Sequence, residues 1–286
     1  MANHSDLHLH TLVSDGNATP LEMLLAAKEA GLERVSFTDH DALGAYRHWG
    51  DLFARAAELG IELVTGIELD ADYRRREVHL LGYGFRLDDA ALNKHLAAVQ
   101  RVRKQRVTQQ LAVINQFFRR KVVDAKKVFL PQRDTLMKPH LVHAMLDQGL
   151  FPDYREAAGW LSEIARIAIH VPKLPLADAI RMVRAAGGEA VLAHPGYMAK
   201  ETDIQLASFL EEFAPLGLAG LEVDYPYFQE AEPQPPFRDL ASEQAMITEL
   251  RSLAGRFNLK MTRGSDAHET EAVKRFAERS AVTSDQ

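Results

Sequence analysis

Histidines and carboxylates recur in short motifs, each near the end of a segment with the pattern of a β-strand. In the first motif, DLHLH at residues 6–10, His8 and His10 project from the same face of the expected strand. Two adjacent imidazoles form half of a typical metal site. Asp15 follows in the next loop, close enough in sequence to turn back toward them. Because His-x-His also occurs by chance on half-buried strands, the other motifs are needed to judge whether it indicates a metal site.

Five further motifs repeat this placement at the ends of later strand-like segments. Each alone has an ordinary structural explanation, such as a capped turn or a hydrogen-bonded core histidine. Their joint occurrence is harder to explain that way, because the carboxyl ends of strands in β-α proteins form the rim that carries functional sites. The candidates are His40 in TDHD, Glu68 in GIE, His79 in VHLLGYG, His194 in AHPG, and Asp266 with His268 in GSDAH.

The segments that carry these motifs alternate with helical patterns. A helix is expected at 20–31, where Thr19 and Pro20 provide a start signal, and another at 43–60. Alternation of this kind predicts parallel β-α units, and seven strands favour an α/β barrel or a doubly wound sheet. The expected strands are 6–10, 35–40, 61–69, 77–84, 189–195, 219–225 and 259–268.

One region interrupts the alternation. Residues 88–163 show only helical periodicity, so we expect a helical insertion there and a barrel formed by 1–87 and 164–286. The insertion includes a basic stretch, 101–127, with nine Lys and Arg residues against the single acid Asp124. This stretch either steers a polyanion toward the barrel or is the solvated face of an amphipathic helix. Residues 225–237, rich in proline and aromatics, are expected to form a loop.

The composition and charge of the chain exclude several kinds of site and surface. The chain has 286 residues, of which 47% are hydrophobic and 26% charged, so it can bury a sizeable core. It has no cysteine, which excludes disulfides, thiolate metal sites and cysteine nucleophiles. The net charge of −6 argues against a broad nucleic-acid surface. Without a long apolar run or a leader sequence, we expect a cytoplasmic protein with no membrane association and no obligate protein partner.

The complete set of motifs resembles the PHP (polymerase and histidinol phosphatase) superfamily. Its characteristic order is present from His8 to His268, apart from the inserted helices. The resemblance implies a distorted seven-stranded β/α barrel that holds two to three divalent metal ions, for which Mn, Fe and Zn all suit imidazole and carboxylate ligands. Within the superfamily the chain is most similar to stand-alone phosphoesterases with a helical insertion. These include nucleoside 3′,5′-bisphosphate phosphatases and enzymes that trim RNA 5′ ends.

The resemblance also implies a ligand set for a trinuclear centre. The third metal requires a histidine from the insertion, for which His140 is the best candidate because a basic-x-His pattern precedes it, and His143 is the rival. The implied sets are His8, His10, Glu68 and Asp266 for the first metal, Asp15, His40 and His268 for the second, and Glu68, His79 and His140 for the third. Lys138 is then expected to contact substrate, and His194 to contact phosphate or protonate the leaving group.

Electrostatics favours a phosphate substrate. Three carboxylates cannot neutralise three divalent ions, so the centre stays positive and suits a phosphate monoester dianion. Bridged metals lower the pKa of water, so we expect a metal-bridging hydroxide to attack phosphorus directly. The chain is therefore predicted to be a metal-dependent phosphoric ester hydrolase acting on a small nucleotide or a short oligonucleotide end. The alternatives are a histidinol-phosphate-type phosphatase, an amidohydrolase, or a non-catalytic PHP binding module.

Overall fold

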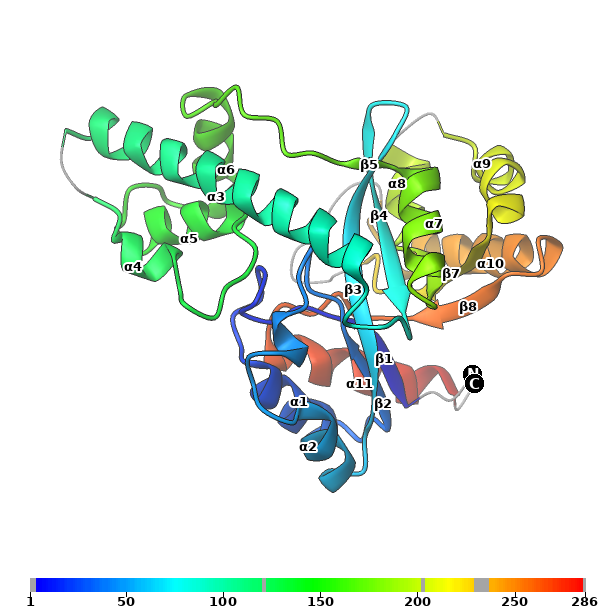
Figure 1. The fold of residues 1–286 in the computed structure, drawn as a ribbon. Coiled ribbons are helices and arrows are strands. Elements are labelled where there is room, and N and C mark those ends of the chain that lie inside the picture. The colour runs from blue at the N-terminus through cyan, green and yellow to red at the C-terminus, as the bar shows by residue number, and fades with distance from the viewer. Residues whose placement is uncertain (1–3, 120–121, 202–203, 229–236, 285–286) are drawn as a thin grey trace.

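A single curled sheet forms the centre of the molecule (Figure 1). The computed structural model describes residues 4–119, 122–201, 204–228 and 237–284. Seven strands follow the order β1-β2-β3-β4-β6-β7-β8, and a short β5 pairs with β3. A parallel bridge between Leu9 and Ala267 joins the two edges. This arrangement confirms the predicted distorted seven-stranded barrel. The strands are β1 Ser5–Leu9, β2 Arg34–Phe37, β3 Glu62–Tyr73, β4 Arg76–Tyr83, β5 Leu174–Pro175, β6 Glu189–Leu192, β7 Leu218–Asp224 and β8 Lys260–Arg263.

Strand β4 departs from the expected parallel arrangement. It runs antiparallel to both β3 and β6, whereas the other neighbours along the path are parallel. The connection from β3 to β4 is a two-residue turn at Arg74 and Arg75, whose φ angles are 52° and 67°. Two consecutive positive φ values are typical of tight hairpin turns. The expectation of parallel β-α units throughout is therefore wrong at β4, because no helix separates it from β3.

The helices that cover the barrel start and stop where local signals predict, with one exception. Helix α1 has a capping box between Thr19 and Glu22 and ends before Gly31, whose φ is 72°. The single helix expected at 43–60 is wrong, because Gly50 with φ 69° separates two short helices. The helices outside the insertion are α1 Pro20–Glu29, η1 Gly44–Tyr46, α2 Leu52–Glu58, α7 Leu176–Ala185, α8 Pro195–Glu201, α9 Leu206–Phe213, η2 Ala214–Leu216, α10 Leu240–Arg256 and α11 Thr270–Ser284.

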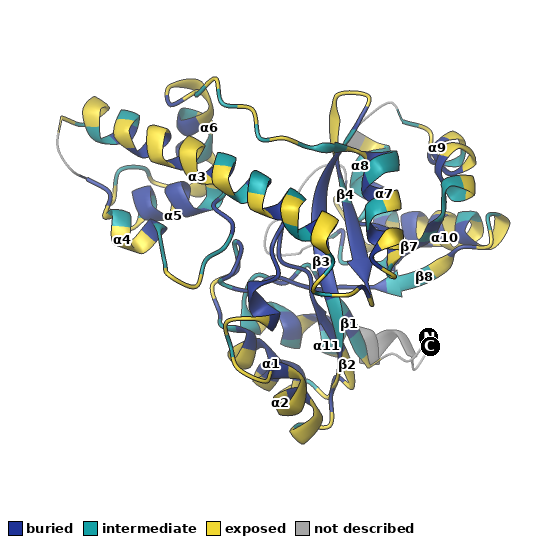
Figure 2. Cartoon of the chain, in the orientation of Figure 1, coloured by how far each residue is buried: buried dark blue, intermediate teal, exposed yellow. Residues whose placement is uncertain are grey.

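Four helices occupy the region expected to be an insertion. They are α3 Ala90–Phe117, α4 Ala125–Val128, α5 Lys138–Leu146 and α6 Tyr154–Glu163. Helix α3 projects from the barrel, and α4, α5 and α6 lie along its far half (Figure 1). Its buried positions alternate with exposed ones along its length (Figure 2). Leu92 and Leu96 join the barrel core, whereas Val107 and Ile114 pack with α5 and α6 in a separate cluster. Helix α3 therefore connects the two packing units.

The expected loop at 225–237 is only partly described. Residues 225–228 have no helix or strand, and 229–236 lie outside the described residues. In the described part of the chain, no helix is both long and apolar enough to cross a membrane.

Candidate metal centre

Four side chains from β1 and its end, from β3 and from the segment after β8 converge at one end of the barrel. His10 Nε2 lies 2.9 Å from Asp266 Oδ1 and 3.1 Å from Glu68 Oε2. His8 Nε2 lies 3.2 Å from the same Glu68 oxygen and 3.1 Å from His10 Nε2. Two ligand atoms of a tetrahedral ion with bonds of about 2.1 Å would be about 3.4 Å apart. The spacing of these four donors therefore fits a shared metal ion.

A second group surrounds the other nitrogen of His10. Asp15 Oδ1 lies 3.7 Å from His10 Nδ1 and 3.4 Å from His268 Nε2. Among the described residues this buried carboxylate oxygen has no hydrogen-bond partner, an unusual state for such an atom. The imidazole of His40 stacks on His10 with ring centroids 4.7 Å apart. A cation held between these groups would satisfy the unpaired oxygen of Asp15.

A third group gathers around the second oxygen of Glu68. His79 Nδ1 lies 2.9 Å and His194 Nε2 lies 3.3 Å from Glu68 Oε1. The two imidazole nitrogens are themselves 3.3 Å apart. His40 Nε2 approaches the opposite oxygen, Glu68 Oε2, at 3.3 Å. Glu68 therefore lies between two groups of histidines, as a bridging carboxylate would.

His140 has a different environment from these residues. Its Nδ1 accepts a hydrogen bond of 2.9 Å from the Met137 amide, and its Nε2 donates one of 2.7 Å to the Ser14 carbonyl. Burial first, and then the positive charge of Arg133, lower the pKa of His140 to about 4. With both ring nitrogens bonded to backbone, His140 has no lone pair free for a metal. The geometry favours His194 over His140 as the partner of His79.

The two other residues expected on the insertion lie near its surface. His143 is exposed on α5, beside the ring of Tyr154. Lys138 begins α5 and donates a hydrogen bond of 2.8 Å to Ser162 Oγ.

Carboxylates and a tyrosine that the sequence did not single out hold the ligands in place. Glu222, fully buried on β7, accepts from His8 Nδ1 at 3.0 Å and from the His194 amide at 2.8 Å. Asp70 Oδ1 lies 3.0 Å from His40 Nδ1, and Tyr225 donates to Asp266 Oδ2 at 2.9 Å. A carboxylate on the second ring nitrogen fixes the tautomer and orientation of a ligating histidine. Spacing could have identified Asp70, because it lies two residues after Glu68 on the same strand face.

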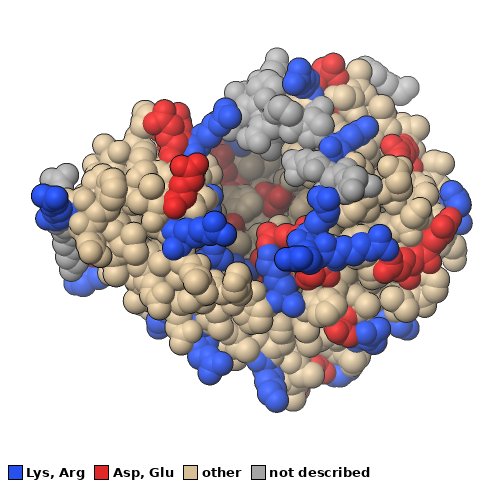
Figure 3. Space-filling view, turned by 90° about the horizontal axis from the view of Figure 1, so that it is seen from above, with Lys and Arg blue, Asp and Glu red and all other residues tan. Residues whose placement is uncertain are grey.

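The charges of the centre favour bound positive charge. Burial lowers the pKa of His10, but hydrogen bonds and charge from Asp266 and Glu68 outweigh it and raise the pKa to about 10. Burial opposes ionisation of Glu68, yet His40 and His8 hold its pKa well below the usual range. Ligand imidazoles must lose their protons to bind a metal, so a metal ion would replace the protons that this field attracts. Figure 3 shows a hollow between the insertion and the barrel, with Asp and Glu inside it and Lys and Arg on its rim.

Comparison with known proteins identifies the family. A model of the PHP domain matches residues 6–169, more than half of the chain. The chain belongs to the PHP family. It is 32% identical over 276 residues to a phosphoribosyl 1,2-cyclic phosphate 1,2-diphosphodiesterase from Eggerthella lenta, covering 92% of this chain and 93% of that one. It is 29% identical over 225 residues to a 3′,5′-nucleoside bisphosphate phosphatase from Chromobacterium violaceum, covering 78% and 77%.

A solved structure extends the similarity to the fold. The PHP-family chain superposes with a TM-score of 0.77 on a structure described as a metal-dependent phosphoesterase from Bifidobacterium adolescentis, at 25% identity, covering 94% of this chain and 89% of that one. These relatives are hydrolases of phosphate esters, and the structure contains clusters of histidine and carboxylate that could bind metal. The predicted class, a metal-dependent phosphoric ester hydrolase, is confirmed.

Proposed function

We propose that this PHP enzyme hydrolyses a phosphate ester of a small ribose-based substrate, a nucleotide or a short oligonucleotide end, with two to three Mn, Fe or Zn ions. The observation that carries the proposal is the convergence of His8, His10, Glu68 and Asp266, in which the two histidine nitrogens lie 2.9–3.4 Å from the two carboxylate oxygens. The two relatives act, by their names, on a nucleoside bisphosphate and on a phosphoribosyl cyclic phosphate. The cytoplasmic location stays a prediction.

The proposal assigns three metal positions. His194 takes the place expected for His140, since its Nε2 is 3.3 Å from Glu68 Oε1. When bound, the metals would lower the pKa of a water molecule and polarise a phosphoryl oxygen. Glu222 and Asp70 would keep His8 and His40 oriented with a lone pair toward the metals. The assigned sets are His8, His10, Glu68 and Asp266 for the first, Asp15, His40 and His268 for the second, and Glu68, His79 and His194 for the third. The donor atoms group as the first set, as His10 with Asp15 and His268, and as His40 with Glu68 and His79.

A substrate screen tests the activity. Phosphate release would be measured with nucleoside 3′,5′-bisphosphates, short 5′-phosphorylated RNAs and histidinol phosphate, for the purified protein loaded with Mn, Fe or Zn. We expect release from a nucleotide substrate, its loss in Asp266→Ala and its retention in His143→Ala, whose side chain is exposed on α5. Full turnover by Asp266→Ala would refute the proposed centre.

Elemental analysis tests the third metal position independently of turnover. His194→Ala should lower the metal content by about one ion per chain, whereas His140→Ala should leave it unchanged. If His194 instead contacts phosphate or protonates the leaving group, its removal would leave the metal content unchanged. A loss confined to His140→Ala would restore the original assignment to the insertion.

A second candidate activity is phosphodiester hydrolysis of a cyclic phosphate. It is favoured by the Eggerthella lenta relative, which matches 92% of this chain. Phosphorus NMR of phosphoribosyl 1,2-cyclic phosphate incubated with the metal-loaded protein would follow loss of the cyclic resonance. A persistent resonance under conditions that support phosphate release from a nucleotide would exclude this activity.

A further inference from the structure

Helix α3 of the insertion contacts the turn after β2, where His40 lies. Gln100 Nε2 donates a hydrogen bond of 2.8 Å to the Asp41 carbonyl, and Arg103 Nη2 lies 2.8 Å from Asp41 Oδ2. The two side chains are three residues apart on the helix and therefore lie on the same face. The insertion thus holds the segment that carries a proposed metal ligand, although none of the assigned ligands belongs to the insertion itself.

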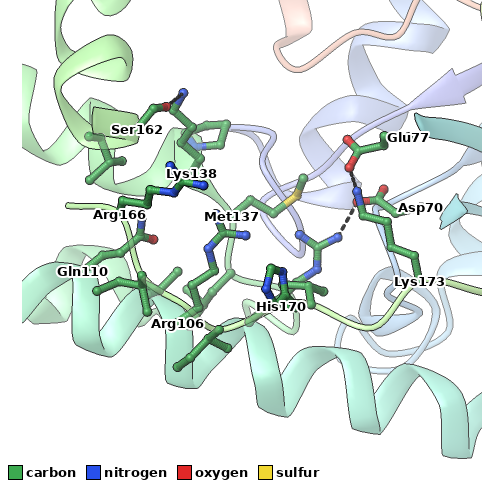
Figure 4. Close-up of a pocket in the computed structure, with 18 residues that line it drawn as sticks. Asp70, Glu77, Arg106, Gln110, Met137, Lys138, Ser162, Arg166, His170 and Lys173 are labelled. Atoms are coloured by element: carbon green, nitrogen blue, oxygen red, sulfur yellow. Dashed lines mark hydrogen bonds and ion pairs between the residues drawn. The ribbon is translucent and has the colours of Figure 1, made fainter. Parts of the chain in front are cut away.

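Arg103 also reaches a second carboxylate of the barrel. Its Nη2 lies 2.6 Å from Asp70 Oδ2. Both residues line a pocket between the insertion and the barrel, with Asp70 on the barrel side (Figure 4). Arg103, Asp41 and Asp70 are all buried, so solvent screens their charges only weakly. Arg103 belongs to the basic stretch 101–127, yet its charge is engaged inside the protein and faces neither solvent nor a polyanion.

The other oxygen of Asp70 faces the metal centre. Asp70 Oδ1 lies 3.0 Å from His40 Nδ1 and 3.8 Å from His79 Nε2. With Nδ1 beside Asp70, His40 directs Nε2 toward Glu68 Oε2, 3.3 Å away. A carboxylate on one ring nitrogen leaves the other nitrogen with its lone pair toward the metal. A continuous chain of polar contacts therefore links Arg103 on the insertion, through Asp70, to His40.

This arrangement depends on the cation between the two carboxylates. Asp41 and Asp70 are neighbours, since Asp41 Oδ1 accepts a hydrogen bond of 3.4 Å from the Asp70 amide. Two buried anions at such a site repel each other unless a cation lies between them. Asp41 also has a φ of 47°, a conformation that residues other than glycine keep only where surrounding contacts hold them. Without Arg103, repulsion would move Asp70 away from His40.

His79 has a similar arrangement that is more exposed. Glu77 Oε1 lies 3.3 Å from His79 Nε2, and Lys173, the residue before β5, pairs with Glu77 (Figure 4). The side chain of Glu77 is 50% exposed, so solvent screens this ion pair and reduces its effect. Arg103 is therefore the stronger connection between the insertion and the metal centre.

We propose that Arg103, supported by Gln100, is a positioning residue that holds His40 in its metal-binding orientation through Asp70. Metal binding at the position assigned to His40 then depends on the contact between the insertion and the barrel. The inference rests on the proposed function, since it takes His40 as a metal ligand. It gives the insertion a role at the metal centre without a ligand from the insertion.

Metal titration tests the proposal. Metal-free wild type, Arg103→Met, Arg103→Lys and the control Arg101→Met, exposed on the same helix, would be titrated with Co²⁺ in competition with a chelator. Arg103→Met should lower the affinity of one binding step about 10–100-fold and leave the others within about twofold. Arg103→Lys should recover part of the loss, because it restores the charge. A purely structural role would weaken all steps alike or none.

A double-mutant cycle shows whether the effect passes through His40. The step weakened by Arg103→Met should be the step that His40→Ala removes. In the His40→Ala background, Arg103→Met should then cause no further loss of metal binding, because the imidazole that it positions is absent. A further loss in that background, or unchanged affinities in Arg103→Met alone, would overturn the inference.

Gln100→Ala provides the test if Arg103→Met does not fold. It removes the hydrogen bond to the Asp41 carbonyl, keeps all the buried charges, and should lower the affinity of the same step about fivefold. Unchanged affinity in both Gln100→Ala and Arg103→Lys would overturn the inference. The titrations use no substrate, so absence of turnover with every substrate would refute the proposed activity alone. Unchanged metal binding in His40→Ala would refute the ligand assignment and the inference together.

Discussion

Replacement of Arg103 by methionine should destabilise the protein strongly, although this residue is on the insertion and binds no metal. Arg103 is 7% exposed, and its Nη2 lies 2.8 Å from Asp41 Oδ2 and 2.6 Å from Asp70 Oδ2. The carboxyl-bearing partners are themselves 1% and 5% exposed. Methionine would fill much of the space but would leave both carboxylates buried without their cation.

The expected magnitude follows from the cost of an uncompensated buried charge. Removal of one partner of a buried ion pair typically costs about 3–5 kcal/mol. For a chain of this size each kcal/mol lowers the Tm by about 2–4 °C, so a fall on the order of 10 °C is expected. Burial opposes the charged form of Arg103, but Asp41 and Asp70 raise its pKa, so the guanidinium stays charged. Burial, and then the charge of Asp70, raise the pKa of Asp41 to about 6.

Urea unfolding of the metal-free protein, followed by circular dichroism, measures this effect. Arg101→Met is the matched control, since that side chain is exposed on the same helix and should change the free energy of unfolding by less than about 0.5 kcal/mol. In a double-mutant cycle, Asp70→Asn should cost less in the Arg103→Met background than in wild type, by about 1 kcal/mol or more. A free-energy change below about 1 kcal/mol for Arg103→Met would refute the reasoning.

Three further predictions concern the support of the metal centre. Glu222→Gln should weaken metal affinity about 10–100-fold, measured by competition with a chelator, because Glu222 orients His8 at 3.0 Å; unchanged affinity would contradict that role. Gly264→Ala should reduce metal content, because its Cβ would lie 2.3 Å from His8 Cβ, whereas Gly159→Ala, with open space around it, should retain full content. Stability should fall as pH drops from about 6.5 to about 4, because the unfolded state then protonates His140 while the folded state, with a pKa of about 4, does not. His140→Gln lacks this titration. The difference in free energy of unfolding between wild type and His140→Gln, measured with urea, should therefore shrink by about 3 kcal/mol over that pH range. A constant difference would argue against the lowered pKa.

Local sequence patterns predict the positions of the strands better than the strand directions or the helix boundaries. All seven strands of the main sheet lie within segments predicted from the sequence, or overlap them, because buried strands are short apolar runs. The helix at 43–60 was predicted wrongly, since apolar spacing did not reveal the interruption at Gly50. The antiparallel direction of β4 was also missed. Strand direction depends on the connection, and the turn at Arg74 and Arg75 lacks the Asn and Gly residues that usually mark tight hairpins.

The sequence by itself determined the PHP family, the barrel and the class of reaction. Most motifs place a metal-binding type of side chain at or just after a parallel strand, whose ends meet at one rim, although Glu68 lies within β3 and His79 on the antiparallel β4. Only the tertiary structure decided that His79 meets His194, 115 residues away, while His140 bonds to the Ser14 carbonyl. It also decided that Glu222 orients His8. These pairings depend on packing between distant segments, which no local spacing encodes.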